Sequence, residues 1–267
     1  MDRGDGPMAL SSPIPDTHVL VIAGSDPTGG AGLARDIETV AAFGLKAAVA
    51  VTAVTVQTHG QVLRVEPTPS ALVAAQMKAA FEAAPIGAVK IGMLATRQTI
   101  EAVASVLEAH GGVPAVLDPV LAATSGGALL ETDAVAALKA RLMPLCHLVT
   151  PNLPELATLT GGTPAADENA AVRQGEALLE EGARAVLIKG GHAGGGDATD
   201  ILLQPARTPV RFEAPRLEAH MRGTGCMLAS AASAGLAAGH DLEESVRTAK
   251  AWLHGHLVKA SQAEGMG

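Results

Sequence analysis

A short glycine-rich segment, Gly223-Thr224-Gly225-Cys226, precedes a run of small, apolar residues that continues to Ala238. The run predicts a buried helix over Cys226 to Ala238, and the two glycines allow successive backbone N–H groups before it to point at one spot. Such an anion hole would stabilise the charge that develops on phosphoryl oxygens during transfer. A thiol at a helix N-terminus is expected to have a lowered pKa, so Cys226 could accept a proton from an attacking hydroxyl. A free cysteine is more often an inert core residue, but this setting favours a catalytic one.

A second glycine-rich loop, Gly24 to Gly32 (GSDPTGGAG), lies between a predicted strand and a predicted helix. Its backbone N–H groups could face a ligand at the start of that helix. A Walker A loop would need Lys and then Ser or Thr after its second glycine, whereas Gly30 and Ala31 follow Gly29, and a GxGxxG spacing is absent too. The loop fits neither nucleotide fingerprint, and a tight turn with Asp26 as a cap is the alternative.

Charged side chains follow several predicted strands. Asp118 comes after an apolar run, Glu155 stands in the helix start Asn152-Leu153-Pro154-Glu155, and Lys189 opens the segment Lys189-Gly190-Gly191-His192. The two carboxylates could hold Mg²⁺ or its water, and the ammonium could contact a phosphate. A capping box at Glu155 and a solvated Lys189 are the alternatives. Because ligands of open α/β sheets bind beyond the carboxyl ends of the strands, we expect these side chains at one site.

Short apolar runs alternate with segments of helical period, an order typical of an α/β fold with a mostly parallel sheet buried on both faces. The predicted strands are His18 to Ala23, Ala47 to Val56, Ala88 to Ile91, Ala115 to Leu117, Leu148 to Thr150 and Ala185 to Lys189, with a hairpin of Ile201 to Gln204 and Val210 to Phe212. The predicted helices are Gly32 to Phe43, Ser70 to Ala84 with Ser70 as N-cap, Thr96 to Ala109, Thr132 to Leu142, Glu168 to Glu181, Cys226 to Ala238 and Leu242 to Ala260.

Composition narrows the classes of function. A net charge of -8 without a basic cluster disfavours nucleic-acid binding. Two cysteines, Cys146 and Cys226, fit a reducing cytoplasm better than a disulfide framework. The nine histidines lack metal-ligand spacing, which disfavours a zinc site. The uncharged stretch Ala47 to Leu63 is too polar for a membrane helix. We expect residues 1–17, rich in Gly, Pro, Ser and Asp, to form a disordered extension and residues 18–267 a single domain.

From about Val19 to about Ala260 the sequence resembles the hydroxymethylpyrimidine and phosphomethylpyrimidine kinases of thiamine biosynthesis, a branch of the ribokinase-like fold. The resemblance is carried by IAGSDPTGGAG at Ile22 to Gly32, VAAQM at Val73 to Met77, KIGML at Lys90 to Leu94, LDPV at Leu117 to Val120, SGGALL at Ser125 to Leu130, TPNLPE at Thr150 to Glu155, KGGH at Lys189 to His192 and GTGC at Gly223 to Cys226. It implies a three-layer αβα domain. It also implies that MgATP phosphorylates the hydroxymethyl oxygen of 4-amino-5-hydroxymethyl-2-methylpyrimidine and then the monophosphate.

The resemblance also implies roles for particular residues. The pyrimidine pocket would be lined by Gly24, Asp26, Ala31, Gln57 and Met93, with Gln57 hydrogen-bonding the ring and Asp36 making polar contacts nearby. Thr150, Asn152, Lys189 and Arg222 would lie along the ATP phosphates, and Asp118 and Glu155 would position Mg²⁺. At the reacting centre, Lys189 would meet the transferred phosphate, Cys226 would be the base, and Gly223, Thr224 and Gly225 the anion hole. Members of this branch are commonly homodimers, so we expect a paired subunit.

Two positions depart from the family pattern beside the predicted anion hole. The chain reads HMRGTGCM at His220 to Met227, so Arg222 replaces a histidine and Met227 replaces a threonine hydroxyl. These changes bear more on the second phosphorylation than on the first. A pyridoxal or pyridoxine kinase is the alternative enzyme, although Gln57 and Met93 favour the pyrimidine. A non-catalytic pyrimidine-binding relative is the other alternative, and retention of Lys189, Glu155 and Cys226 argues against it.

Overall fold

The computed structural model describes residues 16–122, 127, 129–131, 133–190, 196–217 and 221–264. The predicted extension therefore lies almost wholly outside the described residues, and Gly191, His192, His220 and half of Ser125 to Leu130 lie outside them too. The described residues form one sheet in the order β3-β2-β1-β4-β5-β6-β7-β8-β9. Its strands are β1 (His18–Ser25), β2 (Lys46–Gln57), β3 (Val62–Pro67), β4 (Ile86–Ile91), β5 (Ala115–Leu117), β6 (Leu148–Val149), β7 (Val186–Ile188), β8 (Asp200–Leu203) and β9 (Val210–Phe212).

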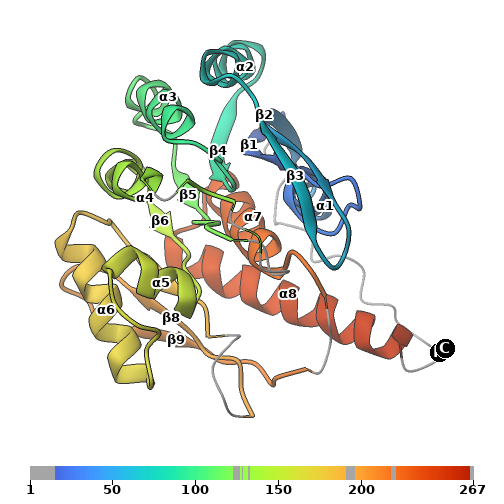
Figure 1. Ribbon diagram of the computed structural model, residues 1–267. Helices are drawn as coiled ribbons and strands as arrows, with labels where there is room; N and C mark the ends of the chain where they lie inside the picture. Colours follow the sequence, from blue (N-terminus) through green and yellow to red (C-terminus); the bar gives the residue numbers. More distant parts are fainter. Residues whose placement is uncertain are drawn as a thin grey trace.

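The six central strands, β2-β1-β4-β5-β6-β7, run parallel, while β3, β8 and β9 are antiparallel additions at the two edges (Figure 1). The hairpin of β8 and β9 confirms the predicted one. The strand β3 was not predicted, because its side chains are mostly exposed and give no apolar run. The parallel centre places the carboxyl ends of β1, β2, β4, β5, β6 and β7 along one edge.

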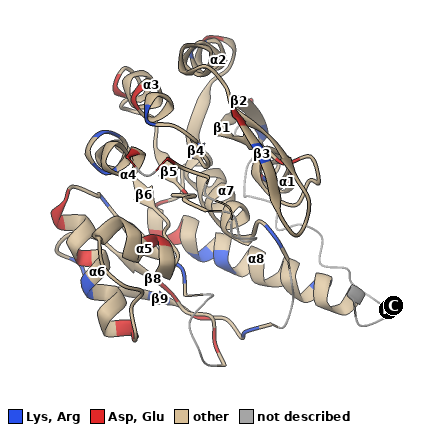
Figure 2. Ribbon diagram, in the orientation of Figure 1, with Lys and Arg blue, Asp and Glu red and all other residues tan. Residues whose placement is uncertain are grey.

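Helices cover both faces of the sheet. They are α1 (Gly32–Ala42), α2 (Ser70–Ala83), α3 (Arg97–Glu108), α4 (Ala134–Ala137), α5 (Leu153–Thr160), α6 (Glu168–Glu180), α7 (Thr224–Ala237) and α8 (Leu242–Glu264). Leu20 and Ile22 of β1 pack in a core with residues of α2 to α6, whereas Val19 and Val21 pack with α1 and α7. This alternation produces the predicted three-layer αβα arrangement, and Figure 2 shows most charged residues on the helices and loops around the sheet. None of the described helices is long and apolar enough to cross a membrane.

Local differences from the predicted elements have local causes. Pro69, not Ser70, occupies the N-cap position of α2, and no side chain caps that end. The predicted helix ending at Leu142 is short α4 followed by a π turn (Leu138–Leu142) and a 3₁₀ turn (Met143–Leu145). The helix α7 begins at Thr224, two residues before Cys226, because Gly223 adopts a left-handed conformation (φ 74°) just before it. Thr224 and Gly225 are therefore part of the first turn of α7.

Candidate active site

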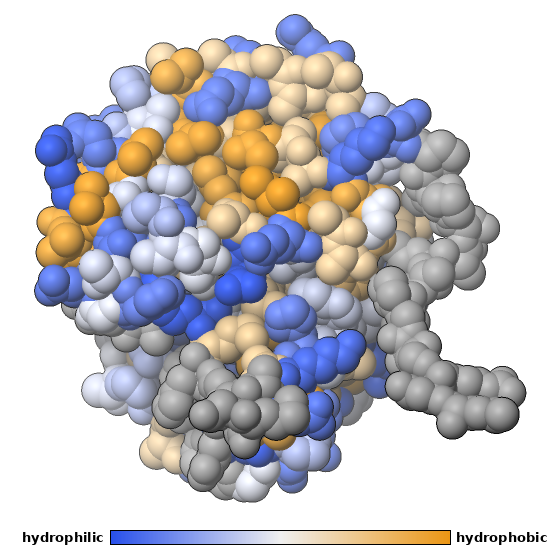
Figure 3. Space-filling model, turned by 90° about the vertical axis from the view of Figure 1, so that its right-hand side faces the viewer, coloured by the Kyte–Doolittle hydropathy of each residue, from blue (hydrophilic) through white to orange (hydrophobic). Residues whose placement is uncertain are grey.

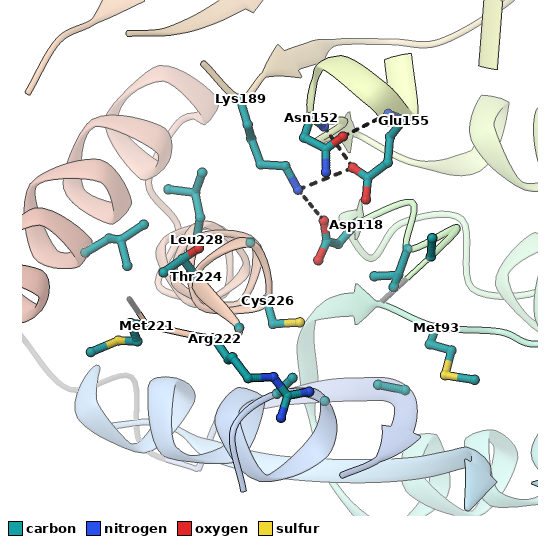
Figure 4. Close-up of a pocket in the computed structure, with 18 of the residues that line it drawn as sticks. Met93, Asp118, Asn152, Glu155, Lys189, Met221, Arg222, Thr224, Cys226 and Leu228 are labelled. Carbon is teal, nitrogen blue, oxygen red and sulfur yellow. Dashed lines mark hydrogen bonds and ion pairs between the residues drawn. The ribbon is translucent and has the colours of Figure 1, made fainter. Parts of the chain in front are cut away.

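A cavity of about 830 Å³ opens at the carboxyl edge of the parallel strands. Gly24 and Asp26 reach it from the end of β1, Gln57 from β2, Met93 from just after β4, and Lys189 from just after β7. The first turns of α5 and α7 also line it, and Figure 4 shows side chains from these separate elements facing one another. The strand-end residues singled out in the sequence thus meet in one place.

Lys189 is the centre of a buried charge cluster in this cavity. Its Nζ lies 2.7 Å from Asp118 Oδ1 and 3.6 Å from Glu155 Oε2, and all three side chains are nearly buried. Burial opposes a charge on Lys189, but the two carboxylates outweigh it and raise the pKa of the ammonium. Burial together with the negative charge of Asp118 raises the pKa of Glu155 to about 7, although Lys189 opposes the shift. The alternative of a solvated surface lysine is therefore wrong.

Glu155 also takes part in a capping box at the start of α5. Asn152 Oδ1 accepts a hydrogen bond from the Glu155 N–H, and Glu155 Oε2 accepts one from the Asn152 N–H, each at 2.8 Å. The structural alternative raised for Glu155 is therefore present in the fold. Within the described part of the chain, both contacts of this carboxylate use Oε2, which leaves Oε1 for another ligand (Figure 4).

The first turn of α7 meets this cluster through its glycines. A Cβ on Gly225 would lie 3.0 Å from Lys189 Nζ, so the absence of a side chain lets the ammonium approach the helix N-terminus. A Cβ on Gly223 would lie 2.5 Å from the carbonyl oxygen of Gly30, so the two glycine-rich loops touch through their backbones. The free N–H groups of the first turn and a buried cation consequently face the same part of the cavity.

Cys226 lines the cavity within the first turn of α7. Burial raises the pKa of its thiol to about 11, although the ammonium of Lys90 and a hydrogen bond from the Gly32 N–H act in the opposite direction. The predicted lowering of this pKa is therefore wrong for the protein alone: desolvation outweighs the helix N-terminus, and Cys226 is a thiol at neutral pH. Its role as a proton acceptor stays a prediction.

Two residues predicted to contact ligands lie behind the cavity wall. Asp36 is fully buried, where its carboxylate pairs with Lys90 Nζ at 2.8 Å and accepts a hydrogen bond from Ser230 Oγ at 2.8 Å. Thr150 is also fully buried and donates a hydrogen bond to Asp118 Oδ1 at 3.3 Å. Asp36 thus holds Lys90, and Thr150 helps to hold Asp118. Neither side chain is placed to contact a ligand directly in this structure.

The residues predicted for the pyrimidine pocket, Asp36 apart, do line the cavity together: Gly24, Asp26, Ala31, Gln57 and Met93. A Cβ on Gly24 would lie 3.0 Å from Met93 Sδ, so the absence of a side chain there gives Met93 its place. Asp26 caps its own turn, because its Oδ1 accepts hydrogen bonds from the N–H and the hydroxyl of Thr28. The cap suggested for Asp26 is thus present, while its carboxylate still faces the cavity.

Arg222 lies with this pyrimidine group and not with the predicted ATP group. Its guanidinium donates to Gln57 Oε1 at 3.0 Å and to Thr28 Oγ1 at 3.2 Å, and Nη1 lies 3.5 Å from Asp26 Oδ2. In Figure 4, Arg222 and Lys189 lie on opposite sides of Cys226. The contact of Gly223 with Gly30 carries Arg222 onto the first glycine-rich loop, which explains the difference from the prediction.

Some cavity residues were missed in the sequence. Lys250 on α8 pairs with Asp200 at 2.8 Å, and both side chains line the cavity. They are fifty positions apart and belong to no motif, so no local signal pointed to them. Lys90 belongs to a motif quoted above, but it was not predicted as a site residue. Its position inside an apolar strand was a usable signal, because a buried charge needs a partner.

Solved structures share this fold. A phosphomethylpyrimidine kinase from Clostridium difficile 630 is 34% identical, with a TM-score of 0.78 over 90% of this chain and 99% of that one. A pyridoxal kinase from Staphylococcus aureus, in complex with AMP-PCP and pyridoxal, is 30% identical, with a TM-score of 0.80 over 89% of this chain and 86% of that one. The fold is therefore that of the ribokinase-like kinases.

Sequence comparison then identifies the branch. The family model described as phosphomethylpyrimidine kinase matches residues 26–267. A hydroxymethylpyrimidine/phosphomethylpyrimidine kinase from Rhizobium meliloti (strain 1021) is 48% identical over 246 residues, which cover 92% of this chain and 92% of that relative. The chain belongs to the phosphomethylpyrimidine kinase family, as its sequence motifs predicted.

Proposed function

We propose that this protein transfers the γ-phosphoryl group of ATP to the hydroxymethyl oxygen of 4-amino-5-hydroxymethyl-2-methylpyrimidine and then to the resulting monophosphate, in thiamine biosynthesis. The observation that carries the proposal is the position of Lys189, beside the glycine turn of α7 and 2.7 Å from Asp118, in the cavity that Gln57 and Met93 also line. Phosphoryl transfer depends chiefly on positioned charge, and this arrangement supplies it.

Each part of the cluster has a distinct task in the proposal. Lys189 and the N–H groups of the first turn of α7 bind the equatorial oxygens of the group in transfer, whose negative charge they offset. Gly223 and Gly225 allow the backbone to approach those oxygens. Burial strengthens these interactions, because few water molecules screen them.

Asp118 and Glu155 would hold Mg²⁺ on the ATP side. Mg²⁺ in kinase sites is usually bound by one or two carboxylates, phosphate oxygens and water, and two carboxylates stand here with Glu155 Oε1 still available. The described residues contain no group of three or more His, Cys, Asp or Glu that could hold a metal, so the phosphates would complete the coordination. The ion would supply charge neutralisation on the transferred phosphoryl group.

Cys226 would accept the proton of the attacking hydroxyl late in the transfer. With a thiol pKa of about 11, it must first release its own proton to solvent, and the Lys90 ammonium and the Gly32 N–H stabilise the resulting thiolate. Replacement of Cys226 by Ala is expected to lower kcat by about two orders of magnitude, as the removal of a general base commonly does. Near-normal turnover in that variant would exclude the role.

Release of ADP in the presence of Mg²⁺ and ATP tests the function. The purified protein is offered the hydroxymethylpyrimidine, its monophosphate and pyridoxine in parallel. We expect turnover of the two pyrimidines to exceed that of pyridoxine, the alternative substrate suggested by the likeness to a pyridoxal kinase. Pyridoxine as the better substrate would reverse the assignment. Pyrimidine binding without ADP release would mark a non-catalytic relative.

We further propose a cytoplasmic homodimer. The family resemblance suggests it, and Val54 and Val56 of β2 are 55% and 50% exposed on one face of the edge hairpin of β2 and β3. Figure 3 shows apolar side chains gathered on the side of the molecule that carries these strands. Sedimentation analysis of the wild type and of Val54→Glu would test the pairing, and a monomeric wild type would exclude it.

A further inference from the structure

Gln57 is held from both ends by hydrogen bonds, and this fixes the direction of its amide. Gln57 Oε1 accepts from Arg222 Nη2 at 3.0 Å, and Gln57 Nε2 donates to Thr55 Oγ1 at 3.0 Å. The Thr55 hydroxyl in turn donates to the Ser25 carbonyl oxygen at 2.7 Å. A guanidinium can only donate a hydrogen bond and a carbonyl oxygen can only accept one. The direction of every hydrogen bond from Arg222 through Gln57 and Thr55 to Ser25 is therefore fixed.

The fixed amide still has hydrogen-bonding capacity for a ligand. An amide oxygen has two lone pairs and an NH₂ group has two hydrogens, and the protein uses one of each. Gln57 lines the cavity, so its remaining acceptor and donor can meet a ring edge that carries an N–H beside an unprotonated nitrogen. The 4-amino group and the adjacent ring nitrogen of an aminopyrimidine have this pattern.

Arg222 is itself firmly placed. Its Nη1 donates to Thr28 Oγ1 and to the Thr58 carbonyl oxygen, and lies 3.5 Å from Asp26 Oδ2, which accepts no hydrogen bond from the described residues. The Arg222 side chain is 19% exposed and that of Asp26 is 1% exposed. A Cβ on Gly30 would lie 3.2 Å from Arg222 Nη1, so the loop fits closely around the guanidinium. These contacts aim one planar donor fork at Asp26, Thr28 and Gln57.

We propose that Arg222 is a positioning residue for substrate selection: it fixes and polarises the amide of Gln57 so that the cavity prefers an aminopyrimidine to a ring without the amino group. The inference rests on the proposed function, because it takes Gln57 as the residue that meets the ring. A hydrogen bond from a charged donor is about twice as strong as one between neutral groups, so Arg222 holds the amide in the selective direction. Loss of Arg222 would free the amide to turn.

A double-mutant cycle on Arg222→Met and Gln57→Ala tests the coupling. Dissociation constants for 4-amino-5-hydroxymethyl-2-methylpyrimidine are measured by calorimetry for the wild type, both single variants and the double variant. We expect R222M to weaken binding about tenfold when Gln57 is present and less than about twofold when Ala replaces it, since a hydrogen bond to a charged group contributes on this scale. The same loss in both backgrounds, or no loss in either, would overturn the proposal.

The preference for the pyrimidine over pyridoxine gives a second readout, which would not change if the role of Arg222 were purely structural. The ratio of kcat/KM for the pyrimidine to kcat/KM for pyridoxine should fall about tenfold in R222M, mainly through KM for the pyrimidine. An equal decline for both substrates would assign Arg222 to folding. A decline confined to the pyrimidine monophosphate would assign it to phosphate binding. Either result contradicts the proposal.

Controls separate the possible failures. Arg141→Met removes an arginine paired with Glu108 at 3.1 Å on the opposite face of the sheet from α7, and should leave pyrimidine binding unchanged. If R222M does not unfold cooperatively on heating, the cycle is repeated with Arg222→Lys, which keeps a positive charge beside Asp26 but loses the planar fork. Absence of pyrimidine binding by the wild type would overturn the proposed function itself, whereas unchanged binding in R222M would overturn only the role of Arg222.

Discussion

Replacement of Lys189 by Met should abolish most of the catalysis and also lower stability, and the structure gives the scale of both effects. At an effective dielectric constant of about 20, a contact of 2.7 Å to Asp118 corresponds to an attraction of about 6 kcal/mol, and one of 3.6 Å to Glu155 corresponds to about 5 kcal/mol when Glu155 is ionised. These attractions offset the cost of burying the charges. Removal of one partner of a buried pair typically costs about 3–5 kcal/mol, because the other charge is left without compensation.

Catalysis should suffer separately from stability. Loss of one donor that stabilises transition-state charge lowers kcat by about 10² to 10³, which is about 3–4 kcal/mol. The double variant Lys189→Met with Asp118→Asn removes the uncompensated carboxylate, so it should regain stability without regaining activity. Thermal unfolding and ADP release are measured for the wild type, both single variants and the double variant. A kcat for K189M within about threefold of the wild type would refute the assignment of Lys189 to the transferred phosphate.

Three further perturbations test other parts of the site. The thiol pKa of Cys226 is about 11, so the rate of its alkylation by iodoacetamide should still rise about tenfold per pH unit between pH 8 and 10. Peptide mass spectrometry measures this rate. A rate that levels off by pH 9 would contradict the raised pKa. Gly223→Ala should lower kcat and the unfolding temperature together. Its Cβ would lie 2.5 Å from the Gly30 carbonyl oxygen, and residue 223 has a left-handed backbone conformation that disfavours alanine. A variant with the unfolding temperature and kcat of the wild type would show that the loops do not touch. Lys90→Met should cost about 3–5 kcal/mol in urea unfolding by isolating Asp36. Without the Lys90 charge the pKa of Asp36 rises further above its unfolded value, so the folded state binds the proton more tightly and K90M should gain stability as the pH falls; a pH-independent loss would contradict this.

The agreement between sequence and structure is best where the signal is local. Apolar runs such as His18 to Ala23 predicted strands buried on both faces, and the polar residues after them predicted the edge at which the cavity lies. The sequence Asn152-Leu153-Pro154-Glu155 contained its own capping box. The strand β3 escaped, because its exposed side chains provide no apolar pattern.

The properties of the site that the sequence did not predict depend on burial and on contacts between residues far apart in the chain. Both arise only when the chain is packed. Cys226 stands at a helix N-terminus, which by itself lowers a thiol pKa, yet the surrounding protein removes enough water to raise it. Asp36 was predicted to contact a ligand, but packing placed it behind the cavity wall, where it pairs with Lys90.

The sequence alone therefore determined the kind of fold and the edge of the sheet that carries the site, and most of the site residues that it indicated do line the cavity, because period and strand ends are local properties. The tertiary structure decided what each charged group faces. Arg222 and Gln57 are 165 positions apart, and no pattern of neighbouring residues could have joined them. The protonation of Cys226, the residue first considered as a proton acceptor, also depends on tertiary packing, since desolvation is a property of the packed molecule.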